Sequence, residues 1–200
     1  MTAAPSALDF VHDPAQAAIL MDPLRLRILE RLAEPESASG LARQFGLPRQ
    51  KVNYHLRELE KAGLVELVEE RRKGNCVERM VRATAVSYVI DPAALGKLAA
   101  DPSRVRDRFS SAYLVAVAAR AIRELATLRA GAEKAGKKLA TMTLETELRF
   151  AHAADRHAFA EELAHAVARL TAKYQDEKSP GDRRFRPLVC AYPAIHKEES

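Results

Sequence analysis

The chain has 200 residues, of which 48% are hydrophobic, and a formal net charge of +5. This length allows one ordinary domain or two small ones, with enough apolar side chains for a packed core. The sequence has no long apolar run and no basic segment ahead of an apolar one near its start, so we expect a cytoplasmic protein with no membrane partner. Cys76 and Cys190 lie far apart and in no CxC or CxxC pair, which argues against a disulfide framework or a thiolate zinc site.

The first half of the chain carries no net charge. Residues 1–91 contain 13 Lys and Arg against 13 Asp and Glu. Any affinity of this half for a polyanion must therefore come from local clusters of charge.

Two short helices are predicted between residues 22 and 46. Asp22-Pro23 places an N-cap residue before a proline at the first helical position, and starts a helix that ends at about residue 33. Ser37 or Ser39 caps a second helix, which Gly46 ends.

A third helix is predicted from Arg49 to Gly63. Its apolar positions Val52, Leu56 and Leu59 recur at helical spacing and are expected in the core, and His55 is expected to be structural. The remaining positions expose hydrogen-bonding and basic side chains, namely Arg49, Gln50, Lys51, Asn53, Tyr54 and Arg57.

From Leu64 the apolar period changes to two, which predicts a β-hairpin running to Val89. Its turn is expected at Gly74-Asn75. Just before the turn lie three cations, Arg71, Arg72 and Lys73.

Recognition of double-stranded DNA by a protein of this kind needs four elements in order: a helix, a tight turn, a second helix and a basic hairpin. The major groove admits one helix, and the hairpin cations reach the backbone or the minor groove. We therefore predict that the nine side chains contact DNA: Arg49, Gln50, Lys51, Asn53, Tyr54, Arg57, Arg71, Arg72 and Lys73.

Residues 14–91 resemble the ArsR-type winged helix-turn-helix family. The most specific stretch is HLxxLxxAGLV, which begins at His55-Leu56 and ends at Leu64-Val65. The resemblance implies a symmetric dimer that binds an inverted-repeat operator and represses until an effector arrives. Many members sense metals through a Cys-x-Cys motif in the helix before the recognition helix. Here that helix reads SASGLARQFG, so we expect a regulator that responds to a small molecule or to no effector.

A long helix is predicted from about 103 to 131, after a short helix over 93–99. Its apolar seam suits dimerisation, the alternative being that it packs on its own domain. The seam consists of Val105, Phe109, Ala112, Ala116, Ala119, Ile122 and Ala126.

The last sixty residues are predicted as a strand (about 141–150), a helix (about 154–174) and a strand (about 185–192), with an effector pocket expected near them. His157, Glu161 and His165 are spaced by four along this helix, the spacing of a metal site, although such pairs are also common on solvent faces. We expect no metal and no cofactor.

The predicted fold class is α+β and mainly helical. Residues 1–91 form a winged helix-turn-helix with an N-terminal arm, and residues 92–200 form a dimerisation and effector domain. The predicted function is a homodimeric DNA-binding regulator, most simply a repressor. The alternatives are an effector-sensing module and a winged helix that serves protein assembly. No phosphate loop, nucleophile elbow or catalytic triad spacing occurs, so we expect no enzymatic activity.

Overall fold

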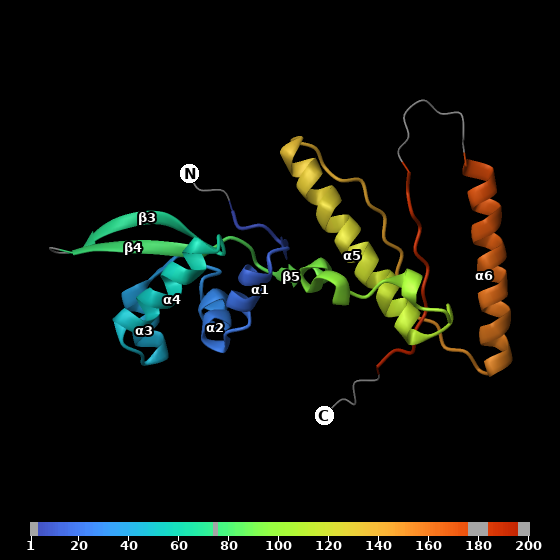
Figure 1. Cartoon of the computed structure of the whole chain (residues 1–200), viewed down its shortest axis with the longest axis horizontal. Helices are drawn as coiled ribbons and strands as arrows, with labels where there is room; N and C mark the ends of the chain where they lie inside the picture. The colour runs from blue at the N-terminus through green and yellow to red at the C-terminus, as the bar shows by residue number, and fades with distance from the viewer. Residues whose placement is uncertain (1–3, 74–75, 176–183, 196–200) are drawn as a thin grey trace. The chain divides into compact units, whose positions relative to one another are not determined.

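The computed structural model describes residues 4–73, 76–175 and 184–195 (Figure 1). The chain divides into two compact units, Met1–Leu139 and Ala140–Ser200. Each unit is considered by itself. No helix within the described ranges is both long and apolar enough to cross a membrane.

The helical layer of the first unit consists of four short helices: α1 (Pro14–Leu20), α2 (Pro23–Arg31), α3 (Ala38–Phe45) and α4 (Arg49–Lys61). Asp22 caps α2 by accepting hydrogen bonds from the N–H groups of Leu24 (2.9 Å) and Arg25 (3.1 Å). Ser37 caps α3, and Gly46 ends it with a φ of 64°, in the left-handed region. The three helices predicted between residues 22 and 63 are thus confirmed, and α1 was not predicted.

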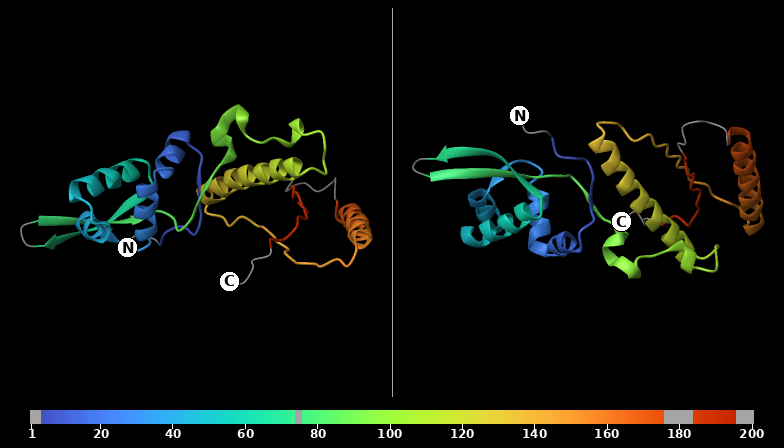
Figure 2. Two further views of the ribbon diagram at one scale, coloured as in Figure 1. Left: turned by 90° about the horizontal axis from the view of Figure 1, so that it is seen from below. Right: turned by 45° about the horizontal axis from the view of Figure 1, so that its top comes forward.

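A three-stranded antiparallel sheet completes the helical layer, in the order β2 (Glu36–Ser37), β4 (Cys76–Ala83), β3 (Val65–Lys73). Strands β3 and β4 form the predicted hairpin, which reaches beyond the helices as a long wing (Figure 2). Its second strand ends at Ala83 and not at the predicted Val89, which belongs to a separate strand. The register shifts between Leu67 and Glu69. The predicted turn at Gly74-Asn75 and the side chain of Lys73 lie outside the described residues.

The N-terminal arm is tied to the chain after the wing. β1 (Asp9–Val11) pairs in parallel with β5 (Tyr88–Ile90), a pairing that the sequence did not reveal. Beside it, His12 Nδ1 lies 2.8 Å from Oδ2 of the buried Asp91. Segments almost eighty residues apart are therefore held together by a short ladder and one polar contact.

The core lies between the helices and the inner face of the sheet. It includes the predicted Val52, Leu56 and Leu59 of α4. The members of this core with 4% exposure or less come from every helix of the layer or the residue after it, from β1 and β4, and from β3 or the residue before it: Val11, Leu20, Ile28, Leu32, Leu41, Val52, Leu59, Leu64, Val65, Val81 and Ala83.

The segment after β5 differs from the prediction of a helix starting at residue 103. Two 3-10 helices, η1 (Pro92–Leu98) and η2 (Pro102–Arg104), precede the long helix α5 (Ser111–Lys134). Asp101 caps η2 as expected, but Val105 is extended and stops it. The cap that starts α5 is Ser110, whose Oγ accepts from the N–H of Tyr113 at 3.2 Å.

The predicted seam of the long helix is divided in the structure. Ala116, Ala119 and Ala126 are buried within this chain, where α5 packs against η1 and η2, so the alternative of packing on the helix's own unit holds for them. Val105 and Phe109 precede the helix, and the Phe109 side chain is fully exposed.

The second unit is built on one helix, α6 (Ala153–Tyr174), which confirms the predicted helix. The strands predicted over 141–150 and 185–192 are wrong, because neither segment forms a ladder with any described residue. Alternating side chains favour an extended backbone, but a strand also needs a neighbour to satisfy its N–H and C=O groups.

The boundary predicted after residue 91 lies inside the first unit, since η1, η2 and α5 belong to it. The division of labour between a DNA-binding part and a dimerisation part remains a prediction.

Candidate nucleic-acid interface

Helix α4 has thirteen residues, which make more than three turns. Its side chains fall on three faces that differ in burial and in what they face. Its buried face holds Val52, Leu56 and Leu59, together with His55, which is 8% exposed as its structural assignment predicted. The helix is thereby fixed against α2 and α3, and the remaining faces are open to a partner.

The face opposite the core carries Gln50, Tyr54, Arg57 and Lys61. All four side chains are exposed, and the Tyr54 ring is 57% exposed, with its edge against His55 at a centroid distance of 5.4 Å. Lys61 Nζ pairs with Glu58 Oε1 at 2.9 Å, which leaves no unpaired acid on this outward face.

A second exposed flank of α4 faces the wing rather than the outside. Arg49, Asn53, Arg57 and Glu60 line a cavity of about 220 Å³ whose opposite wall is β4. Asn53, predicted to contact DNA, is half-buried there. Lys51 lies on the other flank, where its charge contributes to lowering the pKa of His55.

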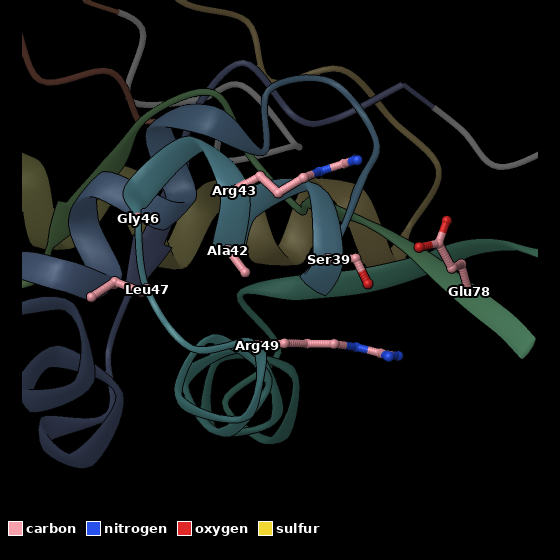
Figure 3. A pocket seen from close by; sticks show the side chains of 7 residues that line it. All are labelled: Ser39, Ala42, Arg43, Gly46, Leu47, Arg49 and Glu78. Carbon is pink, nitrogen blue, oxygen red and sulfur yellow. The ribbon is translucent and has the colours of Figure 1, made fainter.

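A second cavity, of about 380 Å³, lies between α3, the turn after it and β4. Figure 3 shows the side chains of Arg43 and Arg49 extending to the same side, with Ser39 between them and Glu78 beyond, on β4. The sequence prediction included Arg49 but not Arg43, Ser39 or Glu78. The signal for Arg43 was present, since it is the exposed cation of the helix before the recognition helix.

The wing cations are not equivalent. Arg71 is ion-paired with Glu69 on its own strand, whereas Arg72 is exposed and, among the described residues, has no charged partner. Arg79, which the sequence prediction did not include, donates to Glu60 of α4 from both terminal nitrogens, at 2.6 and 3.1 Å. Arg82 pairs with Glu66 at 2.7 Å inside the hairpin.

The contact between α2 and α4 includes buried polar groups. Burial lowers the pKa of His55, with Arg25 and Lys51 acting in the same direction and Asp22 opposing them. His55 Nδ1 has no hydrogen-bond partner among the described residues. Burial opposes ionisation of Asp22, but hydrogen bonds from the Arg25 and Leu24 N–H groups outweigh it and lower the pKa of Asp22.

The candidate metal ligands on α6 are only partly brought together. His157 Nε2 lies 3.3 Å from Glu161 Oε1, and both side chains are exposed. Within the described ranges no three His, Cys, Asp or Glu side chains form a group able to hold a metal ion. The contact is that of a solvent-exposed i, i+4 pair.

Residues 20–68 match a family model described as a helix-turn-helix domain. Among solved structures, the chain is similar to the NMR structure of a homodimeric winged helix-turn-helix DNA-binding domain from Mycobacterium bovis, described as a possible ArsR-family transcriptional regulator. The identity is 26%, the match covers 36% of this chain and 62% of that one, and the TM-score is 0.30. The comparison with curated proteins found no match.

The matched segment contains α2, α3, α4 and the start of β3, so these residues form a helix-turn-helix domain. Together with the β3–β4 wing they make a winged helix-turn-helix domain. The helix-turn-helix predicted from the sequence is thereby confirmed for this segment, and membership of the ArsR-type family stays a prediction.

Proposed function

We propose that this protein is a homodimeric transcriptional repressor that binds double-stranded DNA sequence-specifically through α4 and the β3–β4 wing. One observation carries the proposal. The outward face of α4 combines an amide, a phenol and two cations, without an unpaired acid, beside a wing that carries Arg71 and Arg72. The repressor role rests on the resemblance to ArsR-type regulators.

The roles within the interface follow from the faces of α4. Gln50 stands on the outward face near the helix N-terminus, the part of a recognition helix that meets base edges, and amides pair with adenine. Arg57 and Arg72 supply charge for phosphates. Asn53 and Arg49 turn toward the wing cavity, so we assign them a smaller share of base reading than the outward residues.

The dimer is supported by an unburied stripe on α5. Its apolar members are spaced alternately by four and three residues, the spacing of helices that pack along a seam. None is fully buried, and Leu125 and Leu128 are 39% and 54% exposed. The stripe consists of Leu114, Ala118, Ala121, Leu125, Leu128 and Ala132.

A small-molecule effector remains part of the proposal only through the resemblance. The two cavities described above both lie at the winged helix, and they give no support to an effector pocket in the C-terminal part of the chain.

Selection of bound sequences from a random duplex pool, with light scattering on the same protein, tests the proposal. We expect a dimeric mass and an enriched inverted repeat, with half-sites about 10–11 base pairs apart or a multiple of that spacing. Binding without enrichment would contradict sequence-specific recognition, and a monomeric mass on DNA would contradict the dimer.

Three variants then separate the roles. Arg57→Ala should weaken binding to all sequences and reduce the slope of log K against log salt by about one. Gln50→Ala should change the base preference at one position of each half-site, at a cost of about 1–3 kcal/mol for the preferred base. Arg156→Ala removes the same charge from exposed α6 and should leave both properties unchanged.

A further inference from the structure

The ion pair between Glu60 and Arg79 joins the recognition helix to the wing. Glu60 lies in the last turn of α4, and Arg79 lies in the middle of β4. Both terminal nitrogens of the guanidinium donate to the two oxygens of one carboxylate, at 2.6 and 3.1 Å. This two-point geometry fixes orientation as well as distance.

We propose that Glu60 and Arg79 are positioning residues that set the angle between the recognition helix and the wing, and so decide whether both can engage DNA at once. The inference rests on the proposed function, which it deepens. It also gives Arg79 a role that its place among the wing cations does not suggest: its charge pairs with a carboxylate of the same chain and not with a phosphate.

The two residues line the cavity of about 220 Å³ between α4 and β4, one on each wall. Along the chain, helix and wing are connected only through the short turn from Ala62 to Leu64, at the base of the hairpin. The base of the hairpin is also held by the buried core, which contains Leu56 and Leu59 of α4 with Val65 and Val81 of the wing. The Glu60–Arg79 pair adds a polar connection between α4 and β4 on the exposed side of that core. Arg49, Asn53 and Glu78 stand on the same walls.

A second ion pair on the wing provides a matched comparison. Arg82 donates to Glu66 at 2.7 Å, and the two residues are direct partners in the β3–β4 ladder. This pair lies within the hairpin and does not reach α4. Removing Glu60 or Glu66 deletes the same negative charge, but only the first change removes an ion pair between the helix and the wing.

The test compares the DNA affinity of Glu60→Ala with that of Glu66→Ala. Both variants are made in the full chain and are measured on the duplex obtained from the selection experiment. Loss of an acid near DNA by itself strengthens binding to a polyanion. We nevertheless expect Glu60→Ala to weaken binding about fivefold and to lower the salt slope by about one or two, because the wing loses phosphate contacts. Glu66→Ala should bind at least as tightly as the wild-type protein. The swapped double variant, Glu60→Arg with Arg79→Glu, should recover most of the lost affinity.

A DNA-free measurement separates failure of this inference from failure of the proposed function. Both native cysteines are changed to serine, and nitroxide labels are attached at cysteines introduced in place of Gln50 on α4 and Arg72 on β3. Double electron–electron resonance spectroscopy then gives the distribution of distances between the two labels. The distribution should broaden in Glu60→Ala, stay narrow in Glu66→Ala and narrow again in the swapped variant.

Equal distributions in the two single variants would overturn the positioning role whether or not the protein binds DNA. Tighter binding by Glu60→Ala together with weaker binding by the swapped variant than by the wild-type protein would also overturn it, and would make Arg79 a phosphate contact. If the wild-type protein binds no duplex, the proposed function itself is overturned. The proposed effect of the Glu60–Arg79 pair on DNA binding is then overturned as well.

Discussion

The winged helix and the second unit have sequences of similar apolar patterning and very different interiors. In the winged helix, residues such as Ile28, Leu41 and Leu59 are fully buried by side chains from other helices and strands. Helix α6, with 22 residues, buries none of its side chains. Leu170 on that helix and Met142 before it are 50% and 93% exposed.

The difference shows that a periodic apolar pattern specifies a face and not a partner for that face. Between residues 14 and 91 the chain supplies both layers, so each apolar stripe finds its complement within the same unit. Residues 140–195 supply one helix and extended segments, which leave their apolar side chains without a second layer among the described residues. Helix α5 is intermediate, with buried alanines on one side and an open stripe on another.

The largest expected effect tests this comparison directly. Leu59→Ala removes a fully buried side chain from the winged-helix core and should lower the free energy of unfolding by about 2–5 kcal/mol. Leu170→Ala deletes the same atoms from a half-exposed site on α6 and should cost less than about 1 kcal/mol. Urea unfolding followed by circular dichroism measures both. Equal costs would mean that α6 is buried in solution to the same extent as the core.

A smaller effect is expected at the open stripe of α5. Leu125→Asp places a charge on the proposed dimer seam and should raise the dissociation constant of the dimer about tenfold or more, because the carboxylate must be desolvated or repelled there. Thr127→Asp introduces the same charge on the opposite side of the helix and serves as the control. Sedimentation equilibrium gives the dimer dissociation constants of both variants. Identical values would show that the α5 stripe is not part of the dimer interface.

The smallest effect concerns the buried polar contact between α2 and α4. The pKa of His55 is lowered in the folded state, so the unfolded chain binds the proton more readily. Neutral His55 therefore does not disfavour the folded state above the ordinary histidine pKa of about 6.5. Below that pH the unfolded chain takes up the proton first, and the folded state loses stability relative to it. The free energy of unfolding should therefore decrease as the pH is lowered from 7.5 to 5.5.

The decrease should be smaller in His55→Gln than in the wild-type protein, whereas His165→Gln, at an exposed site on α6, should follow the wild type. Ionisation of Asp22 does not interfere, because its pKa is lowered from 3.8 and its contribution is lost only at more acidic pH. A pH dependence that is the same in all three proteins would show that His55 titrates as an exposed histidine.

The sequence by itself determined the winged helix, since its signals are local. Asp22, Ser37 and Gly46 cap or end helices through their own side-chain or backbone chemistry, and the change of period at Leu64 marks the hairpin. The exposed face of α4 could also be foreseen, because a helix with a fixed core stripe has a fixed opposite side.

Only the tertiary structure decided which neighbours each side chain meets. It turned Asn53 toward the wing, joined Arg79 to Glu60, brought Arg43 beside Arg49, and paired β1 with β5 across almost eighty residues. It also left the segments 141–150 and 185–192 without ladders. The physical reason is the same in each case: capping and periodicity act within a few residues of the chain, whereas ion pairs and strand pairing depend on segments that are distant in sequence.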